Sequence, residues 1–240
     1  GDIEKTKKYD SECQELEDYF IRAKSYFDSN NRLNDIQMRA MKELFNGKKR
    51  LYIHANGQRE ITDAVLMAEK MDIENIVIVG AQQAHKMTAF LKEHNVSLFL
   101  DRIHRLPYTE DSDVDMPYKQ AKILYEAGIT FGFCYQGDME AMGQRNLPFS
   151  AGTAVAHGLP YEQAVAALTH NTAKMLGIDD KVGTLLAGKE ATFFVSKGDA
   201  LDMMGNDVVY AYIQGKAVDL DNKQKVLNRK YRNKYGLPIK

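Results

Sequence analysis

Residues 50–61 of the chain read RLYIHANGQREI. Strand-forming residues lead up to His54, a polar turn with Gly57 follows, and the next segment has the apolar period of a helix. In a parallel α/β fold the loops after the strands carry functional residues, because these loops vary over a rigid sheet. His54 is therefore a candidate functional residue, and loop capping is its structural alternative.

Three further strands are expected downstream of His54, over residues 75–79, 96–100 and 128–134, with helical patterns between them. Consecutive strand–helix units of this kind predict right-handed crossovers and a parallel sheet. The spacing fits half of a (β/α)8 barrel as well as a small open sheet, such as a flavodoxin-like sheet that binds a ligand or partner. The open sheet lacks the G-x-G-x-x-G phosphate loop, since residues 79–84 read VGAQQA.

The segments around this sheet suggest three parts of the chain. Further helices are expected over 10–28, 35–45, 147–157 and 161–175, and short β segments over 191–196, 208–214 and 217–220. No helix divides the short β segments, so they predict a small antiparallel patch. We expect the main α/β unit with two leading helices over 1–180, the β patch over 181–220, and a basic tail or short surface helix over 221–240.

Composition limits the classes of function. The 240 residues carry a net charge of -1, which argues against nucleic acid as a partner, because phosphate binding calls for a positive excess. No apolar run approaches the roughly 20 residues that span a bilayer, so we expect no membrane segment. The two cysteines, Cys13 and Cys134, have no metal or redox spacing.

Several motifs occur in a specific order. Residues 168–177 read LTHNTAKMLG and residues 182–191 read VGTLLAGKEA, and a β hairpin pattern follows over 208–216. Upstream, residues 53–55 read IHA and residues 145–152 read RNLPFSAG. Together they resemble the amidohydrolase superfamily, in its imidazolonepropionase-related branch. The resemblance implies an α/β fold, namely the carboxyl-terminal half (strands five to eight) of a TIM-type (β/α)8 barrel, plus a small antiparallel part of a composite β sandwich.

The resemblance also implies metal ligands. Members of the superfamily hold one or two divalent metals through an H-x-H pair on the first strand, histidines on the fifth and sixth, and an aspartate after the eighth. This chain has no H-x-H. His54 falls at the fifth-strand ligand, Gly80 falls at the sixth, and Asp138 best matches the aspartate that binds metal and moves a proton to the leaving nitrogen. The structural alternative for Asp138 is a helix N-cap.

Other candidates follow the third expected strand. His104 is expected to face the barrel mouth and contact substrate or metal, and a solvent-facing loop histidine is its structural alternative. Arg102 and Arg105 are expected to bind a substrate carboxylate. His85 is expected within a helix, in a surface role.

The resemblance implies a hydrolase acting on carbon–nitrogen bonds, other than peptide bonds, of cyclic amides or related small molecules. A divalent metal, with zinc favoured, would activate the water. The alternative is a metal-free, catalytically inert amidohydrolase-like binding protein, which Gly80 favours. This chain by itself is expected to be inactive and to hold no complete metal site.

A half barrel leaves its two edge strands without a neighbouring strand. It exposes strand edges, so we expect either a homo-oligomer or the N-terminal half of the barrel as partner, or first helices that cover the edges. Gly1 in place of methionine suggests a truncated start, and the compartment stays open between cytoplasm and periplasm.

Overall fold

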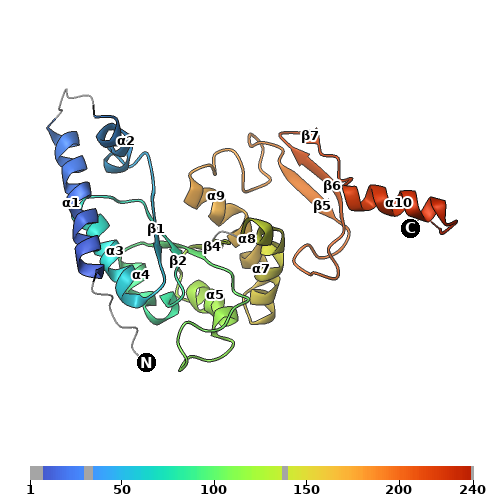
Figure 1. Ribbon diagram of the computed structural model, residues 1–240, viewed down its shortest axis with the longest axis horizontal. Helices are drawn as coiled ribbons and strands as arrows, with labels where there is room; N and C mark the ends of the chain where they lie inside the picture. The colour runs from blue at the N-terminus through green and yellow to red at the C-terminus, as the bar shows by residue number, and fades with distance from the viewer. Residues whose placement is uncertain (1–7, 30–34, 137–139, 239–240) are drawn as a thin grey trace.

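The computed structural model describes residues 8–29, 35–136 and 140–238. Its main body is built on a parallel sheet with strand order β1-β2-β3-β4 (Figure 1). The strands are β1 (Leu51–Ala55), β2 (Ile76–Gly80), β3 (Ser97–Leu100) and β4 (Phe131–Phe133). The predicted parallel sheet, with its strands side by side in chain order, is confirmed.

Helices follow the strands as a βαβ pattern requires. They are α3 (Gln58–Lys70), the 3-10 helix η1 (Ala84–Lys86), α4 (Thr88–Glu93), α5 (Met116–Glu126), α6 (Glu140–Gly143), the 3-10 helix η2 (Gln144–Asn146), α7 (Leu147–Ala156), α8 (Tyr161–Leu168) and α9 (His170–Leu176). The prediction of a single helix over 161–175 is wrong, because the structure has two helices there. The backbone of Thr169, at φ -123° and ψ -85°, divides it into α8 and α9.

The two faces of the parallel sheet are packed against different parts of the chain. One face packs on the helices and forms the main core with residues such as Ile78, Leu98 and Phe131. We call the other face, which carries Tyr52, His54, Val79 and Phe99, the inner face. Side chains alternate along each strand, so these residues share it.

Helix α9 covers the inner face below His54. Met175 of α9 clusters with Val79 and Phe99, and the Tyr52 hydroxyl donates to the Met175 carbonyl oxygen at 2.8 Å. The Tyr52 and Phe99 rings stack with centroids 6.5 Å apart. Two rings and a methionine therefore cluster on the inner face beside His54.

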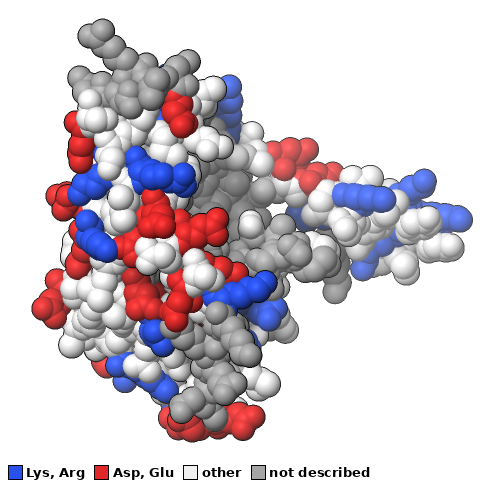
Figure 2. All heavy atoms as spheres, turned by 60° about the vertical axis from the view of Figure 1, so that its left-hand side comes forward, with Lys and Arg blue, Asp and Glu red and all other residues white. Residues whose placement is uncertain are grey.

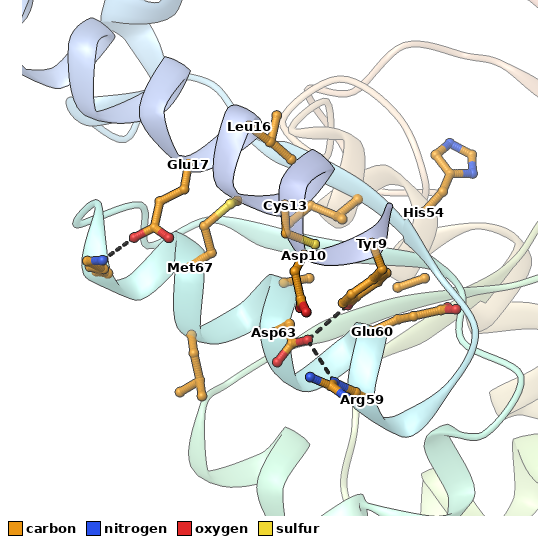
Figure 3. A pocket seen from close by; sticks show the side chains of 15 residues that line it. Tyr9, Asp10, Cys13, Leu16, Glu17, His54, Arg59, Glu60, Asp63 and Met67 are labelled. Atoms are coloured by element: carbon orange, nitrogen blue, oxygen red, sulfur yellow. Dashed lines mark hydrogen bonds and ion pairs between the residues drawn. The ribbon is translucent and has the colours of Figure 1, made fainter. Parts of the chain in front are cut away.

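The leading helices α1 (Tyr9–Asp28) and α2 (Ile36–Phe45) lie beside the β1 edge of the sheet. Helix α1 packs on α3, where the Tyr9 hydroxyl donates to Asp63 at 2.9 Å. A cavity of about 600 Å³ lies between α1, α3 and β1 (Figure 3). The helices thus flank the edge strand across a cavity.

A second, antiparallel sheet of order β5-β6-β7 is made by β5 (Phe193–Ser196), β6 (Val208–Ile213) and β7 (Lys216–Ala217). This confirms the predicted antiparallel patch. Helix α10 (Lys223–Lys234) follows and extends away from the main body (Figure 1). Lys and Arg lie along α10, while Asp and Glu gather over the face of α1 and α3 (Figure 2). Among the residues described, no helix has the length and apolar character needed to cross a membrane.

Candidate active site

The carboxyl ends of β1 to β4 meet at one edge of the parallel sheet, and we call the loops that follow them the rim. Buried polar side-chain atoms without a hydrogen-bond partner gather there. Within the described residues they are Asn56 Oδ1, His85 Nδ1, Asp101 Oδ1 and Arg105 Nε, with Thr184 Oγ1 elsewhere. Native proteins pair the large majority of such atoms. The rim is therefore the candidate functional site.

His54 is exposed at the end of β1, as its place in the pattern predicted. Its Nδ1 lies 2.7 Å from the Gln136 amide oxygen. An amide oxygen only accepts, so Nδ1 carries the proton of the neutral ring and Nε2 keeps a lone pair. Figure 3 shows the imidazole pointing away from the acidic side chains of the cavity. His54 therefore presents a basic nitrogen on the inner-face side of β1.

Gly80 ends β2 with φ +103°, a backbone conformation that disfavours other residues. A Cβ there would overlap the Asn56 amide oxygen and lie 3.2 Å from the Gln136 amide nitrogen. The place where the resemblance expects the sixth-strand ligand is thus filled by two amide groups from β1 and the loop after β4.

The backbone near Asn56 is held by two side chains that sequence reasoning missed. Glu60 accepts hydrogen bonds from the backbone N–H groups of Asn56 at 2.8 Å and Gly57 at 3.0 Å. The Gln83 side chain accepts from the Gln58 N–H at 3.1 Å, and the Gln83 N–H donates to the Asn56 carbonyl at 2.9 Å. A Glu three residues after the helix start is a capping signal that could have revealed Glu60. No local signal pointed to Gln136.

The loop after β3 places Asp101 and Arg105 at the rim. The Asp101 N–H donates to the Gly80 carbonyl at 3.4 Å, beside the two amides. Burial lowers the pKa of the Arg105 guanidinium, and the nearby Asp101 carboxylate acts in the opposite direction. Arg102 is exposed. Carboxylate binding by these arginines stays a prediction.

His104 lies in the loop after β3, as expected, and is exposed. Its Nε2 is 2.8 Å from the Thr153 hydroxyl on α7, and its ring lies near Tyr118 of α5. Burial, together with the charge of Arg102, lowers the pKa of His104. The exposed side chain therefore contacts the helical layer through Thr153. Substrate contact by His104 stays a prediction.

His85 was expected in a helix with a surface role. It does lie in a helix, but its side chain is half-buried rather than at the surface. The residue lies in the 3-10 helix η1 at the rim, half-buried, with Nδ1 unpartnered. Burial is the main cause that lowers its pKa, and Lys86 adds to the effect. The helical pattern begins at Ala84 as a 3-10 turn, and the α-helix α4 follows from Thr88.

Two further residues bear on the chemistry of the rim. Burial raises the pKa of the Cys134 thiol to about 12, with the Asp101 carboxylate contributing, so this sulfur stays protonated near neutral pH. Asp138, the predicted catalytic aspartate and metal ligand, lies outside the described residues.

In the described part of the rim, His54 is the residue that matches a metal ligand implied by the resemblance. His54 offers Nε2, a nitrogen of the type that zinc binds. Gly80 offers no ligand, and its surroundings leave no room for one. Across residues 8–29, 35–136 and 140–238 no group of three or more His, Cys, Asp or Glu could hold a metal ion. The described residues fit a contribution to a metal site, and they do not complete one.

Comparisons with known proteins agree on one family. Amidohydrolase tasK of Hapsidospora irregularis is 23% identical over 189 residues, which are 76% of this chain and 19% of tasK. Among solved structures, an amidohydrolase from Thermotoga maritima MSB8 matches with a TM-score of 0.73 at 23% identity, over 86% of this chain and 55% of that one. An adenosine deaminase from Xanthomonas campestris with bound zinc matches with a TM-score of 0.50 at 16% identity, over 90% of this chain and 61% of that one.

The chain spans about half the length of these solved relatives. At these sequence identities, the structural matches show a shared fold. Proteins of the amidohydrolase family are generally metal-dependent. The profile of the Amidohydrolase family matches residues 34–223, which is most of the chain. This chain belongs to the amidohydrolase family.

Proposed function

We propose that the chain supplies strands five to eight of a (β/α)8 barrel in an enzyme that hydrolyses carbon–nitrogen bonds of cyclic amides or related small molecules. The observation that carries the proposal is His54, which presents Nε2 beside the unpartnered polar atoms of the rim. The antiparallel sheet β5-β6-β7 would be part of the composite sandwich.

The chemistry divides between a metal and the chain. A divalent metal, with zinc favoured, would lower the pKa of water so that hydroxide is available near neutral pH. In this chain His54 would hold the metal through Nε2, and Asp138 would be the second ligand and the proton carrier. Arg102 and Arg105 would attract a substrate carboxylate. Gln136 fixes the His54 ring so that Nε2 remains the free nitrogen.

A second candidate is a metal-free binding protein. It is favoured by Gly80, whose place is filled by two amide groups where the resemblance expects a histidine. Both candidates use the same rim and differ in whether a metal is bound there.

Either function needs a partner for the open sheet. Strand β1 is at one end of the strand order, and the cavity beside it separates it from α1. The partner would be the N-terminal half of the barrel or a second copy of the chain, and the chain alone would be inactive.

Metal content of the full-length gene product that contains this chain would test the proposal. We expect about one zinc per chain or more, hydrolysis of a panel of lactams and cyclic imides, and loss of both in His54→Ala. The matched control His94→Ala, at a helix end where His94 pairs with Glu69, should keep both. A metal-free full-length protein that binds these compounds without hydrolysing them would establish the second candidate instead.

A further inference from the structure

Two amide groups meet beside Gly80 at the rim. The Asn56 amide oxygen and the Gln136 amide nitrogen both lie within 3.2 Å of the point where a Cβ of residue 80 would stand. Asn56 follows β1 and Gln136 follows β4, at opposite ends of the strand order. Folding of the sheet therefore brings a hydrogen-bond acceptor and a donor next to each other.

These two atoms do not bond to each other. Asn56 Oδ1 is buried without a hydrogen-bond partner. Gln136 uses its oxygen for His54 and bonds no described residue through its nitrogen. A buried acceptor that lacks a donor destabilises the fold, and native proteins seldom keep one without a reason. The pair is suited to a ligand that gives a donor to Asn56 and an acceptor to Gln136.

An amide in a small ring has this pattern. The ring holds the amide cis, so the N–H and C=O groups lie on the same edge, whereas an open-chain secondary amide is trans and directs them to opposite sides. We propose that Asn56 and Gln136 form a subsite for the cis-amide edge of a cyclic ligand. Asn56 Oδ1 accepts from the ring N–H, and Gln136 Nε2 donates to the ring carbonyl.

The subsite also gives Gly80 and Gln136 defined roles. Gly80 lets the two amides converge, because a Cβ at residue 80 would overlap the Asn56 oxygen. Gln136 holds His54 with one end of its amide and the ligand with the other, so it brings the ligand carbonyl beside the imidazole. This inference rests on the proposed function and deepens it, since it assigns the recognition of the substrate edge to two residues.

Binding of small amides to the purified chain tests the subsite without any need for hydrolysis. The probes are δ-valerolactam, its N-methyl derivative, which lacks the N–H, and N-methylacetamide, which is an open-chain trans amide. Titrations would follow the side-chain amide signals of Asn56 and Gln136 by 1H–15N NMR. We expect δ-valerolactam to shift both signals, and each of the other two probes to bind about tenfold more weakly, because one hydrogen bond is lost.

Four variants separate the acceptor from the donor. Asn56→Leu removes the acceptor, whereas Asn56→Asp keeps an acceptor oxygen. Gln136→Glu keeps an oxygen near His54 and removes the donor. Gln37→Glu makes the same change on the exposed surface of α2. We expect Asn56→Leu and Gln136→Glu to weaken lactam binding about tenfold, and the other two to leave it within about twofold. If Asn56→Leu does not fold, Gln136→Glu and the N-methyl probe carry the test.

The outcomes separate the subsite from the proposed function. Equal binding of δ-valerolactam and its N-methyl derivative, no shift of either amide signal, or lost binding in Asn56→Asp would overturn the subsite, even if the full-length protein is a hydrolase. Selective lactam binding that disappears in Gln136→Glu would support the subsite, even if the full-length protein hydrolyses none of the compounds and the proposed hydrolysis is wrong.

Discussion

Gly80 combines a left-handed backbone with close neighbours, and Gly188 offers the same backbone without them. Gly188 has φ +93° and nothing within 4 Å of its Cβ position. We predict that Gly188→Ala costs about 1 kcal/mol of unfolding free energy through backbone strain alone. Gly80→Ala should cost about 2–4 kcal/mol, because the new methyl group also displaces Asn56.

Urea unfolding followed by circular dichroism would compare these two variants. Equal losses in Gly80→Ala and Gly188→Ala would mean that the amides beside Gly80 move aside freely. Backbone strain would then account for the whole loss of stability in Gly80→Ala, and the crowding of Gly80 by the two amides would be contradicted.

The tautomer of His54 gives a second prediction at this scale. Gln136 accepts from Nδ1, so the neutral ring should be the Nδ1–H tautomer, which is the minor form of free histidine in water. Long-range 1H–15N NMR of the imidazole reports which nitrogen is protonated. Gln136→Leu should return the ring to a mixture of tautomers, whereas Gln144→Leu, in the nearby η2 helix, should not. A mixture already present in the unmodified chain would contradict the contact.

Thiol reactivity gives a third prediction, with a pH dependence. The thiolate is the reactive form, and a raised pKa keeps Cys134 protonated until the pH approaches about 12. At pH 8 the exposed Cys13 should react with a disulfide reagent while Cys134 does not. In Cys13→Ser almost no thiol should react at pH 8, and reaction of Cys134 should rise with pH. Rapid modification of Cys134 at pH 8 in the folded chain would show that the thiol is not buried.

At the scale of elements, the start of α3 depends on one carboxylate. Glu60 pairs the N–H groups of Asn56 and Gly57, which otherwise lack acceptors at the helix start. We predict that Glu60→Ala lowers the unfolding free energy by about 1–2 kcal/mol. Glu126→Ala, at the exposed end of α5 where it pairs with Lys122, should change it by less than about 0.5 kcal/mol. Thermal unfolding of both variants measures the difference, and equal melting temperatures would show that the cap is not needed.

The same scale shows what the sequence could predict. The four parallel strands were predictable, because their apolar runs alternate with helical patterns and right-handed crossovers leave little choice of topology. The break at Thr169 was not, since the apolar period continues through it and only the backbone departs from helix. The start of α3 carried a readable signal in Glu60.

The site was predictable only where it depends on local order. His54 was found because it ends a strand. Its partner Gln136 is 82 positions away in the chain, and no short pattern records that contact. The contact between His104 and Thr153 was missed for the same reason, because Thr153 is 49 positions away. This difference in predictability has a physical cause. Neighbouring residues determine where a strand ends, whereas the fold of the whole sheet determines which side chains meet at the rim.

At the scale of the molecule, the cavity beside β1 predicts association. An exposed strand edge is a template for pairing, and the cavity on its flank is lined by charged residues and by the exposed Leu16 of α1. We predict that the chain dimerises with rising concentration, and that Leu16→Glu shifts it toward monomer. Ile21→Glu, on the same helix and similarly exposed but outside the cavity, should have little effect. Sedimentation velocity measures both, and a monomer at every concentration would exclude the second copy as the partner.

Tyr52, Phe99 and Met175 cluster on the inner face beside His54. This cluster has a consequence for how substrate and product would enter and leave the site. In a closed barrel this cluster would obstruct the amino-terminal side of the inner face, so a compound beside the imidazole would arrive and depart past the rim. Product that leaves past the rim would then compete with substrate that enters there, and the rate of turnover would fall as product accumulates.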